Sequence, residues 1–108
     1  MKLFAAILPV IGLVAADTLQ LDFHSGASCS DSPFQTFTIG NVGECHNTAQ
    51  TFHAFLEHNI AQSFFGRNLR VFAFAEQNCQ GSFSQLDLSN GLCGIQEGVS
   101  FKIDTKTS

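Results

Sequence analysis

The sequence predicts an all-β fold, and three observations carry that prediction. Short segments alternate apolar with polar residues, turn signals recur about every ten residues, and the same order of parts occurs twice along the chain. Each repeat contains a strand, a turn with a cysteine, a second strand, a glycine turn, a second cysteine, and a Ser or Thr followed by Phe that opens a last strand. We place the repeats at about 19–56 and 69–104, inside a single domain that spans 17–108.

The first repeat begins with "LQLDF" (19–23), which leads to Cys29. The segment "FQTFTI" (34–39) then shows the two-residue period of a strand. The glycine-bearing turn "GNVGE" precedes Cys45, and "TFHAF" (51–55) opens the last strand. Glycine and asparagine mark such turns because they tolerate positive φ angles that other residues avoid.

Residues 48–65 allow two interpretations. As a helix, the segment places its aromatic residues near one face and ends at Gly66. As a strand, it alternates and puts Phe55 and Glu57 on the same side. The repeat favours a strand at 51–56, because this segment occupies the place that "SFKI" has in the second repeat.

The second repeat follows the same order. "VFAF" (71–74) leads to Cys79, "SFSQLDL" (82–88) alternates, the turn "SNG" precedes Cys93, and "SFKI" (100–103) closes the repeat. Around "LRVFAFA" both sides of the strand are apolar or nearly so, which suits a central strand or one buried on both sides.

The first 16 residues have the features of a secretory signal peptide. Lys2 precedes an apolar run over 3–14, and small residues stand at the expected cleavage site. The run is shorter than the roughly 20 residues that a membrane span requires, and it contains Pro9 and Gly12. We therefore expect 1–16 to be removed and the product to be secreted into the extracellular space.

The four cysteines predict a disulfide framework. Their even number in a small secreted chain indicates two disulfides, and their spacing is unlike that of a zinc site. The symmetry of the repeats suggests Cys29–Cys45 and Cys79–Cys93, while the two cross-pairings remain open.

The charge balance excludes two classes of partner. The formal net charge of the whole chain is −4, and loss of Lys2 with the signal makes it more negative. An acidic protein is repelled by nucleic acid and by anionic membrane surfaces unless a basic patch overcomes the net charge. Arg67 and Arg70 are too few to form such a patch. We expect no nucleic-acid partner and no stable membrane insertion.

The stretch "VFAFAEQNCQGSFSQLDLSNGLCGIQEGVSFKI" (71–103) resembles a βγ-crystallin Greek key motif. Phe74 matches the aromatic corner position, Gly81 the obligatory glycine and Ser100 the serine that opens the last strand. In the first repeat Phe23 and Thr51 fit, but Asp31 stands where glycine is expected. The resemblance implies two Greek key motifs that form a βγ-crystallin-like sandwich, here stapled by two disulfides.

The family's calcium sites are not expected in this chain. The resemblance places paired Asn or Asp ligands just before the motif serine, so that their oxygens surround the ion. The windows that end at Thr51 and Ser100 read "HNTAQT" and "IQEGVS", and neither supplies the pair. We predict no metal and no cofactor.

No pattern of catalytic residues stands out in the chain. A hydrogen-bonded or surface role is the favoured interpretation of the four histidines, and no G-x-S-x-G nucleophile motif is present. We therefore predict that the protein is not an enzyme. The histidines are His24, His46, His53 and His58.

One loop is the candidate recognition site. The turn "SFFGRNLR" contains Phe64 and Phe65, which would give a partner a large contact area, together with Arg67 and Arg70. The alternative is that the phenylalanines fill the core, since Phe has no polar tip.

Signal, size and cysteine pattern are also similar to small secreted cysteine-rich proteins of filamentous fungi, many of which are treated as effectors. This likeness implies a virulence-related effector or elicitor that binds an extracellular protein of a host or competitor. The alternatives are an antimicrobial or killer-type toxin and an inhibitor of a secreted protease. The identity of the partner, the binding surface and the oligomeric state do not follow from the sequence.

Overall fold

A computed structural model describes residues 17–107, so the expected signal peptide lies outside the described residues. The described chain is all-β, as predicted, with two short 3₁₀ turns, η1 and η2. The elements in chain order are β1 (Leu19–His24), β2 (Gln35–Ile39), β3 (His46–His58), η1 (Gln62–Phe64), β4 (Leu69–Glu76), η2 (Gln77–Cys79), β5 (Gln80–Asp87) and β6 (Cys93–Thr105).

The six strands form one antiparallel sheet in the order β2-β1-β3-β6-β4-β5. The two halves of the chain contribute equivalent strands, because β2-β1-β3 in the first half corresponds to β5-β4-β6 in the second. The halves meet where β3 pairs with β6 at the centre of the sheet. The strands are continuous in one hydrogen-bonded sheet rather than divided between two separate sheets.

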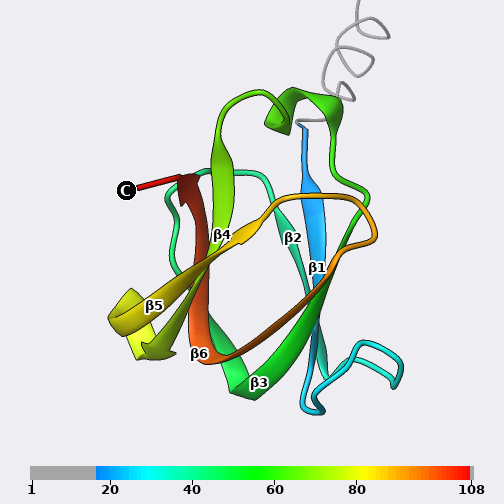
Figure 1. The fold of residues 1–108 in the computed structure, drawn as a ribbon, viewed down its shortest axis with the longest axis vertical. Helices are drawn as coiled ribbons and strands as arrows, with labels where there is room; N and C mark the ends of the chain where they lie inside the picture. The colour runs from blue at the N-terminus through cyan, green and yellow to red at the C-terminus, as the bar shows by residue number, and fades with distance from the viewer. Residues whose placement is uncertain (1–16, 108) are drawn as a thin grey trace, which may run out of the picture.

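The two long strands, β3 and β6, bend sharply, and Figure 1 shows both bends at the bottom of the view. In β3 the bend follows His46 and Asn47, which pair with the last half of β6, and precedes the part that pairs with β1. In β6 the bend lies near Gly98, before the part that pairs with β4. Each long strand therefore pairs with strands in both halves of the sheet.

The bends fold the sheet over a core of phenylalanine rings. The ring centroid of Phe23 on β1 lies 4.7 Å from those of Phe52 on β3 and Phe101 on β6. Since β1 and β6 are not neighbours in the sheet, the contact between Phe23 and Phe101 joins parts that face each other. The main core cluster consists of Leu19, Leu21, Phe23, Ile39, Phe52, Phe55, Ile60, Phe64, Leu69, Val71, Ala73, Phe101 and Ile103.

Two glycines of β6 allow these rings to lie against its backbone. A Cβ atom at Gly94 would stand 2.6 Å from Cζ of Phe55, and one at Gly98 would stand 2.6 Å from Cζ of Phe52. Both distances are far below van der Waals contact. The sequence repeat shows these glycines but does not reveal what fills the space beside them.

The ambiguous segment 48–65 is a strand followed by a short turn. Strand β3 continues to His58, and η1 provides one 3₁₀ turn. The helical interpretation is wrong because the aromatic side chains of this segment pack on both β1 and β6, which a strand between two partners allows.

The disulfides join Cys29 to Cys93 and Cys45 to Cys79, so the pairing suggested by the repeat is wrong. The reason is that the first residues of β3 and of β6 each pair with the strand of the other repeat. The start of β6 pairs with the part of β3 beside β1, which brings Cys93 next to the loop that follows β1. In the same way, the start of β3 pairs with the part of β6 that lies beside β4, which brings Cys45 next to η2. The two bonds are equivalent by the repeat, because Cys29 and Cys79 follow β1 and β4, while Cys93 opens β6 and Cys45 directly precedes β3.

We predict that replacing Cys29 and Cys93 by serine lowers the free energy of unfolding by about 4 kcal/mol, because the bond spans a sequence separation of 64 residues. Replacing Cys45 and Cys79, which are separated by 34 residues, should cost slightly less. Urea unfolding of the oxidised variants measures both values. Non-reducing peptide mapping is the control, and recovery of a peptide that joins Cys29 to Cys45 would contradict the structure.

Candidate functional site

The predicted recognition loop lies between β3 and β4 and is anchored in the core. The side chain of Phe64 is only 3% exposed, and Phe65 is half-buried against the core cluster. The expectation that this phenylalanine pair forms an exposed patch is therefore wrong for Phe64. The pair contributes to the core instead, with Phe64 in the core cluster and Phe65 packed against it.

The two arginines of the loop differ in their freedom. Nε of Arg70 lies 3.4 Å from Oδ1 of Asp87, and its Nη1 donates a hydrogen bond to the carbonyl of Leu69. Arg67 is exposed, with its guanidinium carbon 5.9 Å from the ring centroid of Phe64. Of the four predicted residues, Arg67 is the one most available to a partner.

Ser100, which the sequence places at the opening of the last strand, holds the turn between β4 and β5. Its buried Oγ donates a hydrogen bond of 2.6 Å to the carbonyl of Glu76 and accepts one of 2.9 Å from the backbone N–H of Cys79. Gly81 has a φ of 81°, and a Cβ there would stand 3.0 Å from the Glu76 side chain. The turn therefore depends on a small residue and a buried hydroxyl.

Phe74, the predicted aromatic corner, belongs to a second group of rings on the outer side of the sheet. Its ring centroid lies 5.4 Å from that of Phe83 on β5, and the Phe83 ring lies 5.5 Å from that of Phe72. Nζ of Lys102 lies 5.5 Å from the Phe72 centroid. We call Phe72, Phe74 and Phe83 the outer aromatic cluster.

In the first repeat, two histidines bond to the loop that follows β1, which corresponds to the turn after β4. Nδ1 of His24 donates a 2.9 Å hydrogen bond to Oδ1 of Asp31, and Nδ1 of His53 donates one of 2.8 Å to the carbonyl of Ser25. Asp31, which departs from the expected glycine, therefore fixes the loop that follows β1. These bonds fit the predicted structural role of the two histidines.

The other two histidines also pair with acidic side chains. Nε2 of His58 lies 3.0 Å from Oδ2 of Asp22, and Nε2 of His46 lies 3.5 Å from Oε1 of Glu44. Burial alone would raise the pKa of Asp22, but hydrogen bonds from His58 and Thr36 outweigh it and hold that pKa below its ordinary value.

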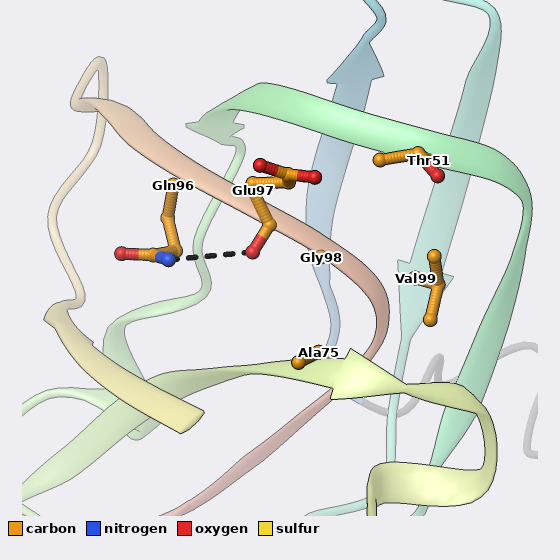
Figure 2. Close-up of a pocket in the computed structure, with 6 residues that line it drawn as sticks. All are labelled: Thr51, Ala75, Gln96, Glu97, Gly98 and Val99. Carbon is orange, nitrogen blue, oxygen red and sulfur yellow. Dashed lines mark hydrogen bonds between the residues drawn. The ribbon is translucent and has the colours of Figure 1, made fainter. Parts of the chain in front are cut away.

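A half-open pocket of about 350 Å³ lies at the bends of the two long strands. Figure 2 shows its lining residues coming from β3, β4 and β6, with Nε2 of Gln96 donating to the carbonyl of Glu97. The pocket is at the small end of the range for ligand sites, and Glu97 supplies its one ionisable side chain. The lining residues are Thr51, Ala75, Gln96, Glu97, Gly98 and Val99.

Within residues 17–107, no three His, Cys, Asp or Glu side chains are grouped so as to hold a metal ion. The same part of the chain contains no helix that is long and apolar enough to span a membrane.

Glu57 is fully buried at the end of the core, a feature that the sequence signalled only by placing it on the same side of the strand as Phe55. Its Oε1 accepts a hydrogen bond of 2.8 Å from the backbone N–H of Ser89, and its backbone carbonyl accepts one of 2.7 Å from Gly91. Burial raises the pKa of the Glu57 carboxyl to about 8, the Ser89 bond opposes this shift, and the charge of Asp87 adds to it.

We predict that Ser100→Ala lowers the free energy of unfolding by about 1–3 kcal/mol, because it leaves the Glu76 carbonyl and the Cys79 N–H without their partner. Urea unfolding measures the change, and amide exchange at Cys79 reports where it acts. Ser82→Ala, on the exposed part of β5, is the matched control and should be nearly neutral. Equal effects of the two variants would contradict the role of Ser100.

We also predict that Glu57 makes the protein less stable as the pH rises. The folded protein keeps a proton on Glu57 that the unfolded chain releases above the ordinary pKa of 4.5. Stability is therefore fully present below pH 4.5 and is lost toward pH 8, by up to about 1.4 kcal/mol per pH unit.

Urea unfolding at several pH values tests this prediction, and Glu57→Gln should remove this part of the pH dependence. Glu97→Gln, at an exposed acidic residue, is the control and should keep it. A Glu57→Gln profile parallel to that of the native protein would contradict the prediction.

No family model, no curated protein and no solved structure matches this chain.

Proposed function

We propose that the protein is a secreted, non-enzymatic protein of the effector or elicitor type, which acts outside the cell by binding a partner protein. The two disulfides support this proposal, because such bonds persist in oxidising extracellular surroundings. The signal-like sequence of 1–16 supports it as well.

We infer that the scaffold is a βγ-crystallin-like pair of Greek keys. The support is the exchange of segments: β2, β1 and the end of β3 (54–58) lie beside the start of β6 (93–95). In the second half, β5, β4 and the end of β6 lie beside the start of β3. Each group is then a four-stranded unit to which the other repeat lends one segment.

The exposure of Arg67 on an anchored loop is the observation that carries the proposed binding role. Its loop is anchored by Ile60 and Phe64 in the core and by a 3.0 Å hydrogen bond from the N–H of Ala61 to the carbonyl of Thr18. A loop that is already ordered loses little conformational entropy when a partner binds. The exposed guanidinium pairs best with carboxylates, which it contacts through two parallel hydrogen bonds. The proposed partner therefore presents an acidic surface.

A protease inhibitor is the second candidate, because the same anchored loop would present Arg67 to an acidic specificity pocket. The glycine and asparagine on either side of Arg67, Gly66 and Asn68, have φ angles of 80° and 59°, which turn the chain sharply at this point. The toxin alternative has no comparable support from a particular residue.

We predict that Arg67→Ala abolishes capture of the partner. The experiment exposes the oxidised, secreted product of the full chain to extracellular extracts of plant tissue, fungi and bacteria, and compares the native protein with variants by quantitative mass spectrometry. Arg67→Lys should retain part of the binding, because it keeps the charge but loses the paired hydrogen bonds. Lys106→Ala removes another exposed charge and should bind normally.

A captured protease whose activity falls on addition of the native protein would assign the inhibitor role. A partner held equally by the native protein and by Arg67→Ala would refute the assignment of Arg67. Proteins that also bind to the reduced and alkylated chain are discounted as nonspecific.

A further inference from the structure

Strand β5 is an edge of the sheet that pairs regularly with β4 from Phe83 to Asp87, after a register shift near Gln80. It pairs with β4 alone, and within residues 17–107 no backbone group of Gln80–Asp87 forms a hydrogen bond with any segment other than β4. Soluble proteins commonly guard such an edge with charged residues or proline, yet 80–86 contains neither. The free N–H and C=O groups of this strand can therefore pair with another strand.

A large apolar side chain lies on this same edge. Phe83 is 46% exposed and extends the outer aromatic cluster to the rim of the sheet. Exposure of a phenylalanine beside buried Phe72 and Phe74 gives the edge an apolar contact surface as well as hydrogen-bonding groups.

The other edge, β2, is shorter, with five residues against eight in β5. Oε1 of Gln35 on β2 accepts a 2.8 Å hydrogen bond from the N–H of Ala49, and the side chain of Gln85 on β5 bonds in a similar way to Thr107. These side-chain bonds leave the outer backbone groups of both edges free, so the strands differ in length and in the exposed Phe83 of β5. The two edges of this symmetric molecule differ in what they offer a partner.

The sequence of β5 is complementary to itself in the antiparallel direction. With a two-fold axis at Phe83, Ser82 faces Ser84 of the second copy, and the direct pairing ends at Gly81, where a φ of 81° and the register shift between β4 and β5 interrupt the regular strand. No charges oppose each other within the paired segment, and Asp87 lies outside it. The two Phe83 rings meet at the axis on the outer side, because Phe83 shares that side with Phe72 and Phe74.

We propose that two copies of this chain associate through β5, so that their sheets continue into one and their outer aromatic clusters join across a two-fold axis. A two-fold axis places the two β5 strands antiparallel to each other, because both copies use the same surface. The contact lies apart from the Arg67 loop, so this inference does not depend on the proposed function.

The charge of the chain gives the dimer a distinctive salt dependence. Each copy carries a formal net charge of −4 as a whole chain, and the removal of Lys2 with an N-terminal signal would make it more negative. The two copies therefore repel each other at low ionic strength, and added salt screens this repulsion. The proposed dimer should become tighter as salt increases, whereas a contact made by Arg67 with carboxylates should become weaker.

Sedimentation equilibrium of the secreted, oxidised protein, from micromolar to millimolar concentration at low and high salt, tests the proposal. We expect a reversible monomer–dimer equilibrium that is tighter at high salt. Phe83→Lys should weaken it by roughly tenfold or more, through the lost aromatic contacts and the charges placed at the axis. Phe83→Ser, which adds no charge, should weaken it to a smaller extent.

Ile95→Lys is the matched control, because Ile95 is 57% exposed but lies on β6 away from the β5 edge. It should dimerise like the native protein. Amide exchange should show added protection in 80–87 at high concentration. A native protein that stays monomeric at millimolar concentration in high salt would overturn the proposal, as would an equal effect of Ile95→Lys and Phe83→Lys.

Discussion

The pairing of β3 with β6 is the constraint on which the rest of the structure depends. Each of these 13-residue strands bends and pairs at both ends with different neighbours, so neither half of the sheet is complete without a segment of the other. Glycine at 94 and 98 makes this possible, because the rings of Phe55 and Phe52 occupy the space where side chains would stand. The result is one continuous sheet made from two repeats.

The disulfides and the turns reinforce that exchange. Each disulfide ties a hairpin of one repeat to the long strand contributed by the other. A chain of this size buries too little surface to be very stable from its core alone, and two long-range bonds compensate by restricting the unfolded chain. The turns within the repeats are held by different groups: Ser100 binds the turn after β4, whereas His24 and Asp31 bind the longer loop after β1.

Few charged side chains are present, and this makes each exposed or buried one informative. Only 13% of the residues are Asp, Glu, Lys or Arg. Most of the described ones have an evident structural partner, such as Arg70 with Asp87 or His58 with Asp22. Glu57 is exceptional because it lies in the core, whereas Arg67 is exposed, with its guanidinium carbon 5.9 Å from the ring centroid of Phe64, in a loop anchored by apolar groups. The outer aromatic cluster supplies the complementary apolar feature on a different part of the surface.

The sequence by itself determined the all-β class, the two repeats, the strand at 51–56 and the presence of two disulfides, because alternation and turn residues act over a few neighbouring positions. The resemblance singled out Gly81 and Ser100 as motif positions, and the structure added that Ser100 holds the second turn. Only the tertiary structure decided the disulfide partners, the burial of Phe64 and the burial of Glu57. These depend on which segments meet after β3 and β6 bend, and pairing between distant segments leaves no periodic trace in either one.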